Sequence, residues 1–234
     1  VKTKVVTFRP TRRGQPVQHQ WTFDGQQIEQ VDSYKYLGVV FHALQGIMQA
    51  PMHLAQSGHK ALFAMQGMCY SQGITDPSIR IHMWQQLVLP VVSYGSEIWG
   101  PQLPYFNDHS AYFRNNPGEK VHMHFLRWYL GARATTHKQI ILQAAGRLPL
   151  MQHWLQRAVA LWNKLANVDP DSWLAHKAFR ENVQLWREGC TSCWAARTIS
   201  HLHELGMLDG NDNSLSVRTL KLEPAEVELS LIHI

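Results

Sequence analysis

The stretch Ser33-Tyr34-Lys35-Tyr36-Leu37-Gly38-Val39 decides the fold, together with the earlier run Val1-Lys2-Thr3-Lys4-Val5-Val6-Thr7-Phe8. The earlier run alternates in polarity and is rich in β-branched residues, which predicts a strand. Between the two runs, Asp24-Gly25 separates two short apolar segments, and this dipeptide is a strong signal for a hairpin turn. Residues 34–41 have the pattern of a further strand. Residues 1–42 are therefore predicted to form a small antiparallel β-unit.

Beyond residue 42 the spacing of apolar residues changes to that of helices. Asp76-Pro77 is predicted to cap and open one helix, and Pro90 is predicted to kink or end it. Residues 101–118 have the composition of a loop, and Thr136 is a candidate cap. We expect helices over residues 52–69, 78–92, 121–130, 136–146, 150–165, 171–179 and 193–205. The predicted fold class is α+β, mostly α, with the small antiparallel β-unit at the N-terminus and a helical body after it.

The bulk composition limits the class of protein. Apolar residues make up 45% of the 234 residues, which is typical of a globular protein. Three cysteines are too few for a disulfide framework, and the first residues lack the charged-then-apolar order of a signal peptide. No run of about 18 apolar residues exists, so no transmembrane helix is expected. We therefore expect neither secretion nor a membrane partner, while the choice between nucleus and cytoplasm stays open.

Charge is spread unevenly along the chain. Residues 1–138 hold 13 Lys and Arg against 7 Asp and Glu, whereas residues 209–234 hold 2 against 5. A basic N-terminal part fits a partner with a phosphate backbone. The alternative is an ordinary basic surface in contact with water. Charge alone does not separate these two interpretations.

The order of these motifs resembles a known family. Lys2-Thr3-Lys4-x-x-x-Phe8, then Asp24-Gly25, then Tyr34-Lys35-Tyr36-Leu37-Gly38 is similar to the end of the palm domain in reverse transcriptases of non-LTR (LINE-type) retrotransposons. Further along, residues 80–100 resemble the long thumb helix of that family, and residues 125–150 resemble the helical segment after it. The resemblance covers roughly residues 1–165. It implies a palm remnant followed by a helical thumb.

The resemblance places one residue of the chain near the chemistry. It maps onto Lys2 a lysine that can neutralise or protonate the leaving pyrophosphate, with Lys4 as the weaker candidate. The alternative is a strand lysine in contact with water. The family's magnesium-binding carboxylates lie in a Y-x-D-D turn, and this sequence has no such motif. We therefore expect no cofactor in this chain, Mg²⁺ in the parent polymerase, and no catalysis by this chain alone.

The same resemblance implies residues that hold nucleic acid. A palm-to-thumb hairpin that grips the primer end would consist of Tyr34, Lys35, Tyr36, Leu37 and Gly38. The expected partner is an RNA–DNA hybrid or template–primer, held through its phosphates rather than by base reading. The candidate thumb contacts are Lys60, Arg80, Lys120, Arg127 and Arg133, with His122 and His124 as weaker donors.

A zinc site is one further hypothesis. Cys190 and Cys193 have the C-x-x-C spacing that suits tetrahedral zinc, but His201 and His203 would face different sides of a helix. We favour thiols packed near Trp194 and predict no metal site. Most of the fourteen histidines are expected at the surface.

We predict four segments: residues 1–42 as the palm remnant with its hairpin, 43–135 as the thumb, 136–208 as a helical extension, and 209–234 as an acidic tail. The last six residues, 229–234, resemble a translated sequencing adapter. Two alternatives stay open: a helical nucleic-acid- or protein-binding module without polymerase ancestry, and a decayed element product without function. The oligomeric state stays open as well.

Overall fold

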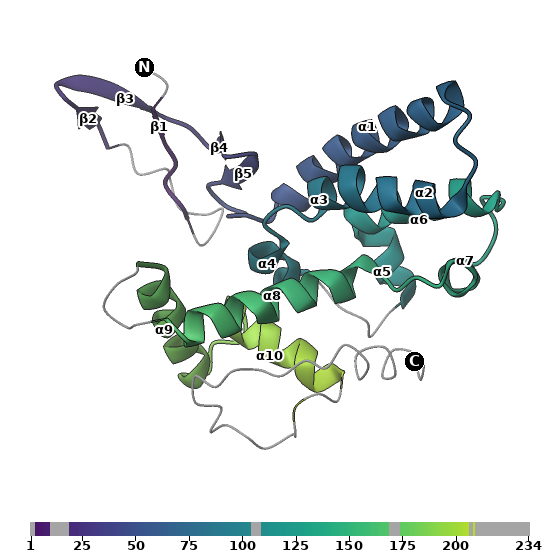
Figure 1. The fold of residues 1–234 in the computed structure, drawn as a ribbon. Helices are drawn as coiled ribbons and strands as arrows, with labels where there is room; N and C mark the ends of the chain where they lie inside the picture. Colours follow the sequence, from purple (N-terminus) through teal and green to yellow (C-terminus); the bar gives the residue numbers. More distant parts are fainter. Residues whose placement is uncertain (1–2, 10–18, 104–108, 169–173, 206–207, 209–234) are drawn as a thin grey trace. The chain divides into compact units, whose positions relative to one another are not determined.

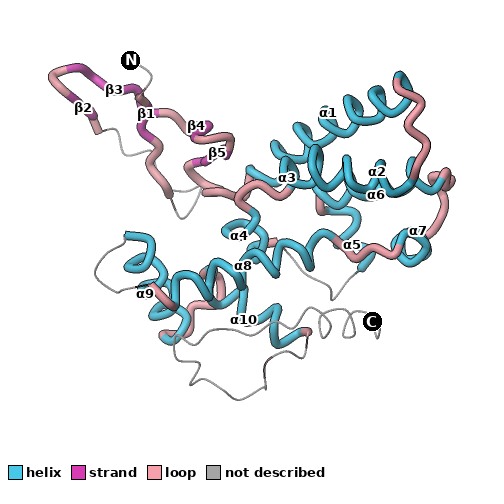
Figure 2. Tube along the Cα trace, viewed as in Figure 1, coloured by secondary structure: helices cyan, strands magenta, loops and turns pink. Residues whose placement is uncertain are grey.

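The computed structural model of the chain describes residues 3–9, 19–103, 109–168, 174–205 and 208. Helices dominate, and short strands lie only near the N-terminus of this described part (Figures 1 and 2). The predicted class, α+β and mostly α, is confirmed. The chain divides into two compact units, residues 1–92 and 93–234, and each is described by itself. The predicted segment boundaries at residues 42, 135 and 208 stay predictions.

The first unit begins with a three-stranded sheet in the order β1-β3-β2 (Figure 1). Strands β2 (Trp21–Phe23) and β3 (Gln26–Gln30) are antiparallel, and Asp24 and Gly25 both have positive φ, so the predicted hairpin is confirmed. Strand β1 (Lys4–Val5) pairs with β3 in parallel. The sheet is thus mixed. Strands β1 and β3 run in the same direction, and β2, which lies between them in the sequence, runs in the opposite direction.

The predicted strand over residues 34–41 is wrong in one respect, because it is a hairpin. Strands β4 (Ser33–Tyr36) and β5 (Val39–His42) pair antiparallel around Leu37 and Gly38. These two residues have φ of 47° and 87°, the positive values that two-residue hairpin turns require. Apolar residues continue on both sides of Gly38, and leucine is an uncommon residue in such a turn, so the pattern hides the reversal.

The helices of the first unit are α1 (Ala50–Ser71), α2 (Pro77–Met83) and α3 (Leu89–Val92). The Asp76 carboxylate accepts from the backbone N–H of Ser78 at 2.7 Å and of Ile79 at 3.2 Å, which confirms the predicted cap. A π-helical turn, η1 (Trp84–Val88), lies between α2 and α3 just before Pro90. Proline lacks the N–H that a regular α-helix needs there, and this break agrees with the predicted kink.

The second unit is helical in its described part. It contains α4 (Ser96–Trp99), a short 3₁₀ turn η2 (Gly100–Gln102), α5 (His109–Asn115), α6 (Pro117–Leu130), α7 (Lys138–Ala145), α8 (Leu150–Ala166), α9 (Leu174–Arg187) and α10 (Trp194–Glu204). Helix α8 is central, with Trp154 and Trp162 fully buried. A Cβ added at Gly118 would come within 2.9 Å of the Trp154 ring, so α6 can pack this closely only with glycine there.

Two details of the second unit differ from the sequence expectations. Helix α5 and the start of α6 lie within residues 101–118, which were predicted to be a loop. The residue before α7 is His137 rather than Thr136, and its side chain makes no capping hydrogen bond. Asp171 and Ser172, together with the tail 209–234 and its last six residues, lie outside the described residues.

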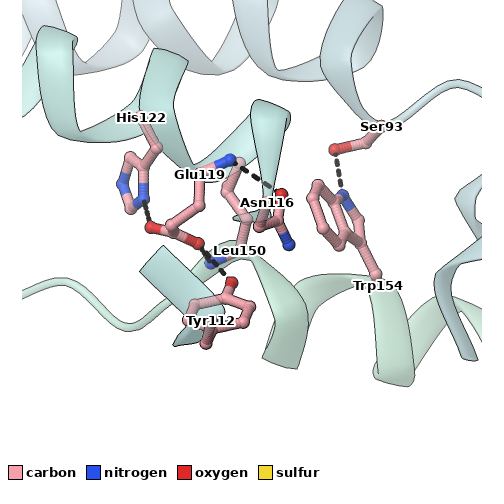
Figure 3. A network of polar contacts seen from close by, with 7 residues as sticks. All are labelled: Ser93, Tyr112, Asn116, Glu119, His122, Leu150 and Trp154. Carbon is pink, nitrogen blue, oxygen red and sulfur yellow. Dashed lines mark hydrogen bonds and ion pairs between the residues drawn. The ribbon is translucent and has the colours of Figure 1, made fainter. Parts of the chain in front are cut away.

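A buried carboxylate joins three helices of the second unit (Figure 3). Glu119 is fully buried near the start of α6. Its carboxylate accepts from the Tyr112 hydroxyl on α5 at 2.5 Å, from His122 Nδ1 at 2.8 Å, and from the backbone N–H of Leu150 on α8 at 2.8 Å. The Asn116 side chain caps α6 by accepting from the Glu119 N–H at 3.0 Å. A buried charge is tolerated because each oxygen has donors.

We expect Glu119→Ala to lower the free energy of unfolding by about 3 kcal/mol or more, because three buried donors lose their acceptor. Urea denaturation measures the loss, and amide exchange in α6 and α8 assigns it to the second unit. The matched control is Glu181→Ala on α9, an exposed glutamate, for which we expect a change within about 0.5 kcal/mol. Equal effects of the two changes would contradict the role of Glu119.

The β4–β5 turn allows a second test of the fold. Leucine with positive φ is strained by about 1 kcal/mol, whereas asparagine adopts this conformation readily. We expect Leu37→Asn to slow hydrogen exchange of the β4 and β5 amides about fivefold. Leu37→Ala keeps the strain and is the control, with no slowing expected. Slowing of the same size in both variants would show that the backbone is unstrained at this position.

Candidate nucleic-acid interface

Helix α1 has one face in the core and one face open to solvent. Its buried positions include Leu54, Leu62, Met65 and Cys69, all 5% exposed or less. On the opposite face, at helical spacing, large apolar and aromatic side chains lie beside a histidine and a lysine. We call this row the α1 strip: Met52, His59, Lys60, Phe63 and Tyr70.

Aromatic and apolar groups dominate the α1 strip. Tyr70 is 70% exposed, Met52 59% and Phe63 54%. The His59 and Phe63 rings stack with centroids 6.1 Å apart and planes 23° apart, and Lys60 is exposed beside them. Flat rings next to a cation are the combination that proteins use to stack nucleic-acid bases and attract the backbone.

The β4–β5 hairpin adds a second exposed group in the same unit. At its tip, Tyr36 is 58% exposed and Leu37 71%. Lys35 is exposed as well, and its Nζ lies 3.5 Å from His53 Nε2 in the first turns of α1. Strand β5 packs against α1. The hairpin base is therefore held at the end of α1 where the strip begins with Met52.

The predicted primer-grip residues and two thumb residues lie in the first unit. Tyr36, Leu37 and Gly38 are exposed at the turn, while Tyr34 is half-buried. These positions agree with a gripping role but do not test it. Lys60 extends from the α1 strip. Arg80 differs, because its Nε donates to the Ile74 carbonyl at 3.0 Å and closes the connection before α2.

The other predicted cations lie in the second unit. Lys120 and Arg127 line one cavity, and Arg133 does not. His122 is wrong as a phosphate donor, because it is buried and its Nδ1 is bonded to Glu119. The sequence signal for this pair is a glutamate and a histidine three residues apart on a helix.

Lys2, the predicted catalytic residue, lies outside the described residues. Its neighbour in the motif, Lys4, forms an ion pair with Glu29 across the β1–β3 pair. That pairing satisfies the charge of Lys4 within the sheet. It leaves the role of Lys2 as a prediction.

The Cys190–Cys193 segment does not assemble a metal site in the structure. His201 is buried and its Nε2 lies 3.0 Å from the Pro101 carbonyl, and His203 Nδ1 lies 3.1 Å from the Leu208 carbonyl. Burial lowers the pKa of His201, and this outweighs the opposing effects of the Pro101 carbonyl and of Glu204. Within the described ranges, no three His, Cys, Asp or Glu side chains are grouped as metal ligands. His122, His176 and His201 are buried, so these three depart from the expectation that most histidines lie at the surface.

Among the residues that the structure describes, none of the helices has both the length and the apolar character needed to cross a bilayer.

Comparison with known proteins gives one partial similarity. Over 73 residues the chain is 32% identical to a Caenorhabditis elegans protein whose name calls it uncharacterized and transposon-derived. The match covers 31% of this chain and 25% of that protein, so the chain spans about a quarter of the length of this relative. No family model matches, and no solved structure matches. The similarity supports a transposon-related origin of the chain.

Proposed function

We propose that this chain is a part of the reverse transcriptase of a non-LTR retrotransposon and that it holds the template–primer. The observation that carries the proposal is the β4–β5 hairpin, built from the Y-K-Y-L-G motif and fixed at the start of α1 by the Lys35–His53 contact. The transposon-derived relative supports an origin from a transposable element. The non-LTR type and the polymerase activity of the parent rest on the motif resemblance described above.

The α1 strip and the hairpin tip offer contacts of two kinds. Phe63, Tyr70 and Tyr36 present ring faces that can stack on bases or sugars, and Lys35 and Lys60 present charges to phosphates. Such contacts do not read sequence, because every base has a ring face and every nucleotide has a phosphate. That matches a polymerase, which must hold any template.

Catalysis is not part of the proposal for this chain alone. The parent enzyme would bring Mg²⁺ through carboxylates of a Y-x-D-D turn, which this sequence does not contain. Lys2 would then act beside the leaving pyrophosphate. Residues of the first unit would keep the primer end in place while that chemistry occurs elsewhere in the parent.

We expect the chain to bind a fluorescent RNA–DNA hybrid with an affinity that falls as salt rises, measured by anisotropy at several salt concentrations. Phe63→Ala should weaken binding about fivefold to a hundredfold, since one lost stacking contact costs about 1–3 kcal/mol. Lys60→Ala should instead reduce the slope of log affinity against log salt by about 0.9. Neither side chain is buried, so both variants should fold normally.

The control is Lys177→Ala, an exposed lysine on α9 in the second unit, which removes the same charge from the protein without touching the strip. Equal losses in Lys60→Ala and Lys177→Ala would contradict the α1 strip. Absence of hybrid binding even at low salt would contradict template–primer holding as a whole and favour a decayed product.

A further inference from the structure

A cavity of about 320 Å³ lies in the second unit, and its polar lining is cationic. Arg114 comes from α5, Lys120 and Arg127 from α6, and Lys138 from the first position of α7. Phe113 and Met123 complete the wall. Three helices therefore bring four positive side chains to one space, although two of these residues, Arg114 and Lys138, stood out in no sequence motif.

Three of these charges have no acidic partner in the described part of the chain, where none of the ion pairs includes Lys120, Arg127 or Lys138. The Glu119 carboxylate acts on Lys138, but it is buried and occupied by Tyr112, His122 and the Leu150 N–H. An excess of positive charge at one point raises the free energy of the fold unless an anion is present.

One hydrogen-bond donor of Arg127 has no acceptor in the described part of the chain. Its Nε is buried and has no hydrogen-bond partner among the described residues. A buried donor without an acceptor costs about 1–3 kcal/mol, and an anion in the cavity would remove that cost. A planar guanidinium is also well suited to bind two oxygens of one phosphate.

Lys138 has its amine held at the cavity wall. Its Nζ lies 5.1 Å from the centre of the Phe113 ring, a cation–π distance. Burial lowers the pKa of Lys138, and the charges of Arg127, Arg114 and Lys120 lower it further, against a smaller opposite effect of Glu119. Repulsion between like charges causes the part of the lowering that comes from Arg127, Arg114 and Lys120, and a bound anion would raise the pKa of Lys138 again.

A neighbouring cavity of about 470 Å³ shares Phe113, Arg127 and Lys138 with the first. It extends along residues 134–137 to the start of α7. The His137 side chain does not cap that helix, so it accepts from none of the first N–H groups of α7. Helix N-termini attract anions through such groups. At this site, the first N–H groups of α7 and the cations of the cavity would attract the same anion.

We propose that this cavity is a binding site for a phosphate group, held by Arg127, Lys120 and Lys138 with Arg114 at the rim. Phosphate fits better than a carboxylate ligand, because it offers more acceptor oxygens and up to two negative charges to a cluster of four cations. The ligand is either a nucleic-acid phosphate or a free phosphate compound. The site rests on the cavity alone and does not depend on the hairpin or the α1 strip.

The reactivity of Lys138 tests the site directly. An amine-reactive reagent modifies only the neutral amine, and mass spectrometry of the full chain measures the modification rate of each lysine. We expect saturating inorganic phosphate to slow modification of Lys138 by about tenfold, since a tenfold loss of neutral amine corresponds to a pKa one higher. Sodium chloride at equal ionic strength should slow it far less. Lys60 and Lys177 serve as internal references that phosphate should not affect.

Variants separate a built site from general screening. Arg127→Gln and Lys120→Gln should each weaken the phosphate protection of Lys138 about tenfold or more, because each removes a charged donor. Arg133→Gln removes a charge three residues past α6, from a side chain that does not line the cavity, and should leave the protection unchanged. Circular dichroism checks that each variant is folded, and two independent lining variants guard against one that is not.

Three results would overturn the proposal: no slowing of Lys138 by phosphate, equal slowing by chloride, or equal loss of protection in Arg133→Gln. A second arm replaces inorganic phosphate with pyrophosphate or with a short RNA–DNA hybrid. Protection by the hybrid at lower concentration than by either free phosphate identifies a nucleic-acid phosphate as the ligand, and the reverse identifies a free one. Phe63→Ala should leave the inorganic-phosphate effect intact, so failure of template–primer holding and failure of this site are distinguishable.

Discussion

The buried carboxylate of Glu119 is the interaction on which the second unit depends. Its two oxygens receive hydrogen bonds from α5, from α6 itself and from the first residue of α8. A single buried charge thereby fixes the relative positions of three helices, and replacing any one donor would leave the charge partly unsatisfied. The neighbouring residue in the sequence, Lys120, is exposed at the cation-lined cavity. The same turn of helix that holds the core together thus also orients the cations.

The first unit depends on a different constraint, the two-faced character of α1. One face is apolar and buried, as in any amphipathic helix. The other face also carries large rings, and those of Phe63 and Tyr70 are more than half exposed to water. Exposed apolar patches of this kind usually mark a surface that binds another molecule. The hairpin tip, with Tyr36 and Leu37 exposed, repeats the pattern.

Local signals in the sequence were sufficient for much of the fold. The Asp24-Gly25 turn, the Asp76 cap and the break near Pro90 all depend on a few adjacent residues, and each agrees with the structure. The expectations failed where the deciding contact is distant. The β1–β3 pairing is parallel because of chain reversal at β2, and Glu119 is buried because α5 and α8 supply donors 7 and 31 residues away.

The residues of the candidate sites also divide into those that the sequence identifies and those that only the folded structure brings together. Lys120 and Arg127 could be named from the sequence, because they are cations in a helix that the resemblance assigns to nucleic-acid contact. Arg114 and Lys138 could not be named from the sequence. Arg114 lies in a stretch that was predicted to be a loop, and Lys138 becomes a neighbour of the other cations only through the packing of α7. A cation is common at any surface and informative only where several converge. Convergence is a property of the fold rather than of the sequence pattern.

The two candidate surfaces would contribute to binding through different physics. Contacts of the α1 strip are mainly ring faces, whose stacking energy changes little with salt. Those of the cation-lined cavity are charges, and binding there releases counterions, so its contribution falls steeply as salt rises. A protein with both kinds of surface keeps part of its affinity at salt concentrations that abolish a purely electrostatic contact. That property would suit the proposed function, in which nucleic acid is retained without recognition of its sequence, and it requires the rings and the charges to be separate residues, as they are here.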